Sequence, residues 1–322
     1  MQYQPEPYDV TQAIETAIAH EHAEKFCLEI AFFGGSFTAL ERGYMISLLE
    51  AAQPFVTGGI IKGIRVSTRP DAVDDAILQC LKQYGVTAIE LGAQSMVDAV
   101  LRANRRGHTA QQVRNAAKLI KAQGFALGLQ MMTGLYTDTA EGAVQTAAEI
   151  AECKPDTVRI YPTVILRHTR LGELYEQGRY CTLSLEETVE LCSGLLVFFE
   201  QRYIPVIRLG LHDSPELQRN YLAGPWHPAF GELCYSRKMR NEILRRLHNE
   251  FVPGEIILTV HPAWHSKAVG QKRCNLQFFA DLGYDVQVRT DENMAQGQWK
   301  LQRALSGKEQ KRAATVIRDS RV

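Results

Sequence analysis

The sequence predicts an α/β protein whose parallel strands close into a TIM-like or partial barrel. Three observations support this prediction: short apolar segments alternate with longer helical ones, N-cap signals precede the helices, and polar or glycine residues recur where the apolar segments end. Alternating strands and helices imply parallel pairing through right-handed crossovers. A doubly wound open sheet is the alternative arrangement of the same elements.

Six strands are expected in the first two thirds of the chain, each followed by a helical pattern. They cover residues 28–33, 63–68, 87–92, 125–131, 157–163 and 204–209. Helix starts are expected at Asp71 after Pro70 and at three capping boxes, in which the N-cap and the third helical residue satisfy each other's backbone N–H groups. The boxes pair Thr109 with Gln112, Asp138 with Glu141, and Ser184 with Glu187.

The chain is expected to divide into three parts. Residues 1–210 form the barrel, 211–290 form a small α/β extension with a strand, loop, helix and strand, and 291–322 form a polar, basic tail. The tail holds few large apolar side chains and cannot bury much surface, so a mobile segment or a weakly held helix is expected there.

Composition excludes some classes of partner. The 322 residues have 45% hydrophobic and 22% charged side chains, and 36 basic residues balance 36 acidic ones, so bulk attraction to nucleic acid or membrane is not indicated. No apolar run approaches the roughly 18 residues of a membrane span, and the first residues lack the pattern of a secretory signal. A cytoplasmic protein without a membrane partner is expected.

Cysteine and histidine patterns do not indicate a metal site. The seven cysteines include no C-x-x-C pair and are expected to be reduced thiols. His261 and His265 have an i, i+4 spacing that suits zinc on a helix, but Pro262 argues against a shared helical face. A barrel hydrolase or lyase is disfavoured, because the strand ends carry no cluster of Asp, Glu or His.

Polar residues at the strand ends are the first candidates for a site, since the loops after parallel barrel strands meet at one rim. The pair Gly34 and Gly35 lets another molecule approach the backbone, although a tight turn would need the same residues. Charged residues also interrupt the apolar strands and would be costly to bury unpaired. We expect them to pair with one another or to face a wet barrel interior; they are Glu29, Arg65, Glu90 and Arg159.

Several motifs, in their order and spacing, resemble those of the radical S-adenosylmethionine (SAM) enzymes, and within them most of all the Elongator catalytic-subunit branch. The motifs are FFGGSFT, RVSTRPDAV, AIELGAQSMVDAVLRANRRGHT, MMTGL and PDTVRIYPTVILRHTRLGELYEQGRY, and the resemblance covers about residues 10–210. Oxygen-independent coproporphyrinogen oxidase-like proteins belong to the same superfamily. The resemblance implies a partial (β/α)6 barrel whose first βα unit is missing or incomplete, because the strand at 28–33 aligns with the family's second strand.

The resemblance also implies a SAM site at the barrel mouth. The glycine loop would contact the methionyl amino group, Arg69 is suited to grip a carboxylate, and Arg106 is a second anion partner or a surface arginine. The residues implied for the cofactor are Gly34, Gly35, Ser36, Thr68, Arg69, Gln94, Ser95, Arg106, Gln130 and Met132, and those implied for the substrate are Tyr161 and Arg208.

The sequence departs from the family at its iron–sulfur site. Family members hold a [4Fe–4S] cluster with three closely spaced cysteines and use it to form a 5′-deoxyadenosyl radical, but this chain has no such triplet. Either the chain is an N-terminally shortened form, or its lineage has lost the cluster. As it stands it is expected not to cleave SAM, and a clusterless module that binds SAM or RNA is the alternative function.

The resemblance implies RNA as a further partner, because Elongator relatives modify the wobble uridine of tRNA. It also implies an electron-donor protein, because the family's chemistry begins with a one-electron reduction of SAM. A basic run between residues 237 and 246 could contact phosphate. Acidic neighbours at Glu242 and Glu250 also fit a solvated helix face.

Overall fold

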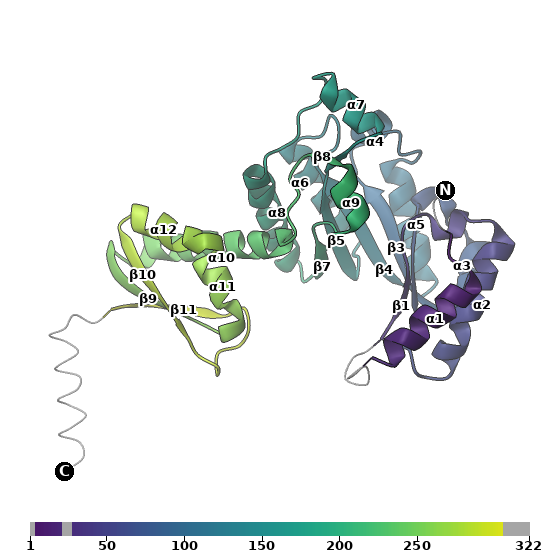
Figure 1. The fold of residues 1–322 in the computed structure, drawn as a ribbon, viewed down its shortest axis with the longest axis horizontal. Coiled ribbons are helices and arrows are strands. Elements are labelled where there is room, and N and C mark those ends of the chain that lie inside the picture. The colour runs from purple at the N-terminus through teal and green to yellow at the C-terminus, as the bar shows by residue number, and fades with distance from the viewer. Residues whose placement is uncertain (1–3, 21–27, 305–322) are drawn as a thin grey trace, which may run out of the picture. The chain divides into compact units, whose positions relative to one another are not determined.

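The computed structural model describes residues 4–20 and 28–304 and divides into two compact units, Met1–Pro228 and Ala229–Val322 (Figure 1). The division falls later in the chain than the expected boundary at residue 210.

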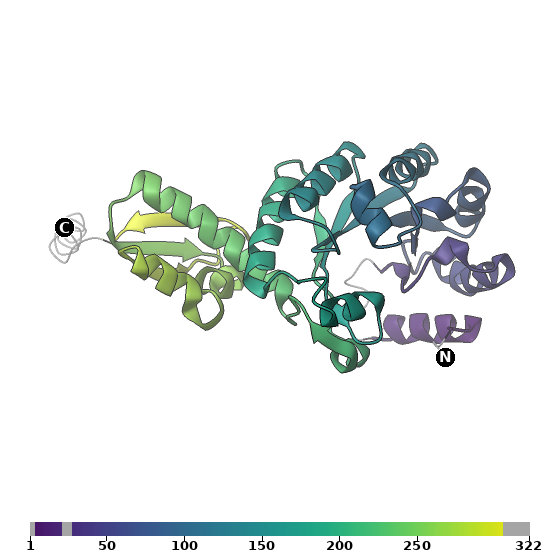
Figure 2. The same cartoon turned by 90° about the horizontal axis from the view of Figure 1, so that it is seen from above.

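The first unit is built on a curled sheet of six parallel strands in the order β1-β2-β3-β4-β5-β7. The strands are β1 (Ile30–Phe32), β2 (Ile64–Thr68), β3 (Val86–Gln94), β4 (Ala126–Thr133), β5 (Thr157–Pro162) and β7 (Val206–Leu209). Figure 2 shows the sheet curving like part of a barrel, with helices on its outer side. The expected six strands and the partial barrel are therefore confirmed.

The helices of this unit follow strands, as the alternation predicts, except α1, which precedes β1. They are α1 (Pro7–Ile18), α2 (Arg42–Thr57), α3 (Asp75–Gln83), α4 (Asp98–Ala103), α5 (Ala110–Ala122), α6 (Ala140–Glu152), α7 (Arg170–Glu176), α8 (Leu185–Glu200) and α9 (Pro215–Asn220). A small antiparallel pair, β6 (Ile165–Leu166) with β8 (Tyr221–Ala223), lies beyond β5.

Alternation along β2 shows how the sheet is covered. Ile64 and Val66 are fully buried, whereas Arg65 between them is only partly buried. Because successive side chains of a strand point to opposite faces, one face packs against helices and the other lines the concave side. The charged strand residues therefore lie on the concave face.

Two of the three expected capping boxes are confirmed, at Thr109 and at Ser184. The third is wrong: Thr139 caps α6, its side chain accepting a hydrogen bond from the Gly142 N–H. Asp138 precedes the N-cap residue by one position, so it does not cap the helix, and its carboxylate is partly buried. The helix start at Asp71 also differs, because Asp71 lies in a 3-10 turn and Asp74 caps α3.

The second unit contains a three-stranded mixed sheet in the order β10-β9-β11. Its elements are α10 (Phe230–Glu250), β9 (Gly254–Val260), α11 (His265–Val269), α12 (Cys274–Asp281), β10 (Tyr284–Thr290) and β11 (Trp299–Arg303). Strand β10 is parallel to β9 and β11 is antiparallel to it. The structure differs from the expected tail at residues 299–303, where Leu301 enters the core; residues 305–322 of the tail lie outside the described residues.

Among residues 4–20 and 28–304, no helix is both long enough and apolar enough to cross a bilayer.

Candidate functional site

The carboxyl ends of the parallel strands bring most of the expected site residues to one edge of the first unit. Strand register sets Phe32 beside Val66, Gln94 beside Met131, and Met132 beside Tyr161. The loops that follow these strands therefore begin on the same rim.

The glycine loop after β1 leaves its backbone bare. Gly34 has a φ of +105°, and a Cβ placed on Gly34 or Gly35 would meet no atom within 4 Å. Neither glycine forms a backbone hydrogen bond with another described residue. The loop also borders a cavity of about 420 Å³ against α2. Its N–H and C=O groups are thus open to a ligand.

A chain of hydroxyl groups fixes this loop to the end of β2. The Thr68 Oγ1 lies 2.9 Å from the Ser36 Oγ and 2.5 Å from the Thr38 Oγ1. The Ser36 Oγ also accepts a hydrogen bond from the Arg69 N–H at 3.2 Å. Thr68 is only 3% exposed, so in this structure it holds the glycine loop through Ser36.

The guanidinium of Arg69 is already engaged by a neighbouring carboxylate. Its Nε donates to the Asp71 Oδ1 at 2.9 Å and its Nη2 to the Oδ2 at 2.5 Å. The hydrogen bond with Arg69 lowers the pKa of Asp71. A ligand carboxylate at Arg69 would have to compete with this two-point contact.

Gln94 and Gln130 form a polar pair at the ends of β3 and β4. The Gln94 Nε2 donates to the Gln130 Oε1 at 2.9 Å. Gln94 has a φ of +66°, at an irregularity in the pairing of β3 with β4. A non-glycine residue in the left-handed region is uncommon, and such strain concentrates at functional sites.

Ser95 points away from this pair. It is fully buried, accepts a hydrogen bond from the Val97 N–H at 3.1 Å and lies 3.3 Å from the Thr146 Oγ1 of α6. In this structure Ser95 joins β3 to a helix, whereas Gln94 is turned to the rim.

Arg106 lies in the loop after α4, next to Met132 at the end of β4. Its Nη2 is 3.4 Å from the Met132 Sδ, its Nε is buried without a hydrogen-bond partner, and burial lowers the pKa of the side chain. His108 holds this loop, with ring nitrogens 3.1 Å from the Ala93 oxygen and 3.2 Å from the Arg106 oxygen. His108 is not among the residues predicted from the sequence, where its only signal is its place in the NRRGHT motif.

Charged side chains on the concave face pair with one another, as expected. The Arg65 Nε lies 2.7 Å from the Glu29 Oε2 and its Nη1 3.2 Å from the Glu90 Oε1. The Arg159 Nε lies 2.5 Å from the Glu90 Oε2, and its guanidinium covers the Phe33 ring at 4.6 Å. We call these four charged residues the inner-face network.

The two residues expected to bind substrate lie at the same side of the sheet. The Tyr161 hydroxyl accepts a hydrogen bond from the Arg159 Nη1 at 3.4 Å. Arg208 lies on β7, the strand next to β5, and its Nε donates to the Gly210 oxygen at 3.1 Å. Arg159 therefore connects Tyr161 to the inner-face network.

The described residues do not fit an iron–sulfur cluster. Six described cysteines are free thiols in separate elements, and Cys27 lies outside the described residues. Within the described ranges no three His, Cys, Asp or Glu side chains come together as metal ligands. His261 caps a 3-10 turn and His265 begins α11, so they do not share a helical face.

Comparison with known families gives two matches that follow one another along the chain. The profile described as "Radical SAM superfamily" matches residues 2–150, and that described as "Radical_SAM C-terminal domain" matches residues 155–241.

Curated relatives include Elongator complex protein 3 of Homo sapiens and of Saccharomyces cerevisiae. The human protein is 32% identical over 207 residues, which cover 56% of this chain and 38% of the relative. The yeast protein is 27% identical over 261 residues, covering 72% of this chain and 46% of the relative. The matched regions thus span less than half the length of either relative.

Among solved structures, the archaeal Methanocaldococcus infernus Elp3 with an N-terminal deletion has the same fold. It superimposes with a TM-score of 0.62 at 22% identity, over 77% of this chain and 65% of that chain.

Proposed function

The chain belongs to the radical SAM superfamily, and from this premise we propose that the carboxyl edge of β1 to β4 binds S-adenosylmethionine. The observation that carries the proposal is the Gly34–Gly35 loop, whose backbone groups have no partner among the described residues and face open space. Bare carbonyl oxygens are suited to accept hydrogen bonds from an ammonium group, and the missing Cβ atoms allow the close approach that this needs.

Three further side chains fit the remaining parts of SAM. Arg106 has a buried Nε without a partner, so its guanidinium suits the methionyl carboxylate better than that of Arg69, which holds Asp71. The amides of Gln94 and Gln130 can exchange their mutual hydrogen bond for bonds to ribose hydroxyl groups. Ser36 and Thr68 act by fixing the glycine loop.

In the superfamily, SAM and a [4Fe–4S] cluster together supply a 5′-deoxyadenosyl radical. The described cysteines do not fit that cluster. We therefore expect this chain to bind SAM without cleaving it. The measurement is an assay for 5′-deoxyadenosine after anaerobic treatment with iron, sulfide and a strong reductant. Formation of 5′-deoxyadenosine would show that a cluster can assemble on these 322 residues.

The binding proposal is tested by titration calorimetry with SAM and with S-adenosylhomocysteine. We expect Gly34→Ala to weaken binding by about tenfold, because the new methyl group occupies the space into which the ligand must approach. Gly59 provides a matched control, since it also has a positive φ and open space but lies in the loop before β2, at the other end of that strand. Equal losses in Gly34→Ala and Gly59→Ala, or no binding to the parent chain, would contradict the proposal.

A role in tRNA modification is a more specific proposal than SAM binding. The basic run at residues 237–246 of α10 gives it little support. Lys238 lies 3.5 Å from Glu242, Arg246 lies 2.7 Å from Glu250, and Arg237 is buried. Two cations of the run are thus paired with carboxylates of the same helix, which fits a structural helix face. A gel-shift titration with tRNA tests the proposal: a salt-sensitive shift that survives charge reversal on α10 would place RNA binding elsewhere.

A further inference from the structure

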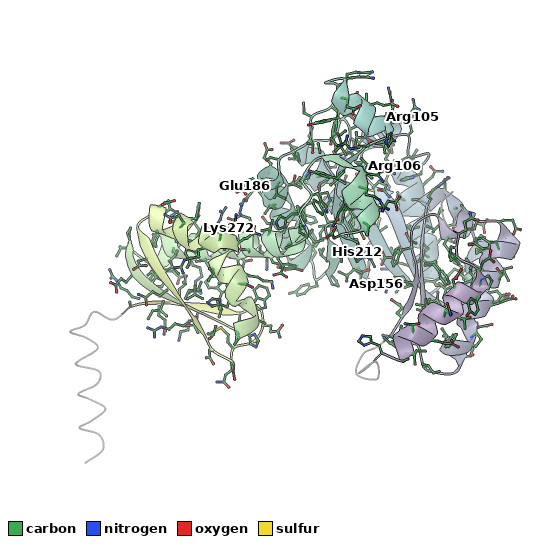
Figure 3. The ribbon with its side chains drawn as sticks, in the orientation of Figure 1. Arg105, Arg106, Asp156, Glu186, His212 and Lys272 are labelled. Atoms are coloured by element: carbon green, nitrogen blue, oxygen red, sulfur yellow. The ribbon has the colours of Figure 1, made fainter. Side chains whose placement is uncertain are left out.

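A second cavity of about 590 Å³ lies beyond the ends of β4 and β5, in the first unit. Four arginines line it and no acidic residue does; they are Arg105, Arg106, Arg170 and Arg179. They come from the loop after α4, the start of α7 and the segment after α7, and Figure 3 shows Arg105 and Arg106 close to α4 and α7. We call these four residues the arginine pocket.

Most of this positive charge has no counter-charge within residues 4–20 and 28–304. Arg170 pairs with Glu173 at 2.7 Å, whereas Arg105, Arg106 and Arg179 form no ion pair with a described carboxylate. The chain as a whole balances 36 basic with 36 acidic residues, so a cluster left uncompensated in one cavity is a local feature.

A buried hydroxyl group in the wall gives an independent indication of a ligand. Thr163 is 4% exposed, lines the cavity, and its Oγ1 has no hydrogen-bond partner. Buried polar groups are nearly always satisfied, so an unsatisfied one in a cavity wall marks a place for an external partner. The same wall carries apolar surface from Leu135, Leu171 and the ring of Tyr136.

From these features we propose that the arginine pocket binds a phosphate ester of nucleotide size. Guanidinium groups bind phosphate oxygens through paired hydrogen bonds, and Thr163 adds a neutral donor. The volume lies within the range of small-molecule sites, and the apolar wall suits the body of such a ligand. Arg106 and Met132 border both this pocket and the proposed SAM site, so the two sites adjoin. Binding of the phosphate ester rests on Arg105, Arg170, Arg179 and Thr163, and only the role of the ligand as substrate rests on the SAM proposal.

The test uses cytidine 5′-diphosphate as the probe, because a pyrimidine differs from the adenosine of SAM, and uncharged cytidine as its control. We expect Arg105→Gln and Arg179→Gln each to weaken binding of cytidine 5′-diphosphate by about tenfold. Arg42→Gln removes an exposed arginine at the start of α2 and should change nothing. SAM affinity, measured in the same variants, should stay at the parent value, which separates a failure here from a failure of the SAM proposal.

Thr163→Val provides a second test that does not depend on charge. The substitution removes an unpartnered hydroxyl group while keeping the shape of the side chain, so thermal stability should be kept or slightly raised while nucleotide binding falls severalfold. The proposal is overturned if cytidine binds as well as its diphosphate, if Arg42→Gln loses as much as the pocket variants, or if only an RNA oligonucleotide binds.

Discussion

The inner-face network and the arginine pocket lie in the same unit but differ in whether their arginines are paired with carboxylates. In the network, Arg65 and Arg159 meet Glu29 and Glu90 at distances between 2.5 and 3.2 Å. In the pocket, four guanidinium groups share a cavity whose lining includes no carboxylate. The charges of the network are therefore balanced without a ligand, whereas the positive charge of the pocket is not balanced by the residues that line it.

This difference separates residues that support the barrel from residues that can bind something. A compensated cluster gains nothing from an anion, because an incoming charge would have to displace a partner that is already well placed. An uncompensated cluster is repulsive until an anion arrives. The two clusters should therefore respond in opposite ways when one charge is removed.

The largest effect is expected at Glu90, which is 2% exposed and contacts both arginines of the network. Glu90→Gln removes the carboxylate that Arg159 pairs with and leaves Arg65 paired with Glu29 alone, and should lower the free energy of unfolding by about 3 kcal/mol. Urea unfolding measures this. Glu149→Gln breaks the more exposed pair with Arg114 and should cost less than about 1 kcal/mol. A similar loss in both variants would contradict a structural role for the network.

Asp138 offers an intermediate case, a partly buried carboxylate whose two oxygens have no hydrogen-bond partner. Burial raises its pKa from 3.8 to about 6. The folded state therefore holds this proton more tightly than the unfolded state, so the contribution of Asp138 to stability is most favourable below about pH 4 and is lost as the pH rises through 6.

Asp138→Asn should remove that dependence. The variant and the parent should differ little at pH 4, and above pH 6 the variant should be more stable by about 1 to 2 kcal/mol, allowing for the part of the side chain that is open to water. Thermal unfolding between pH 4 and pH 8 measures the difference. A constant difference at all pH values would show that the substitution acts through packing and not through the proton.

The sequence predicted the barrel well because its signals are local. Apolar runs and caps such as Thr109 and Ser184 lie within a few residues of the structure they determine. Local signals fail by single residues where two candidates are adjacent, as at Asp138 and Thr139. They also missed β11, although apolar residues alternate with polar ones at Trp299 and Leu301.

The site was predictable only where one short segment carries it. The bare backbone of Gly34 and Gly35 could be inferred from the two glycines alone, but the burial of Ser95 beneath α6 depends on a contact with Thr146, far along the chain. The arginine pocket joins residues from 105 to 179 that no periodicity links. Only the fold places them around one cavity.

The smallest change in the free energy of unfolding is expected in the arginine pocket. The sign of that change distinguishes repulsion between the arginines from compensation by carboxylates. Arg179→Gln removes one of several like charges, so the free energy of unfolding should stay within about 0.5 kcal/mol of the parent or rise. Added salt should stabilise the parent relative to this variant, because salt screens repulsion. Arg114→Gln, which loses an attractive pair, should show the reverse salt dependence. Thermal unfolding at low and high salt compares them, and the same salt response in both would mean that the pocket arginines are compensated after all.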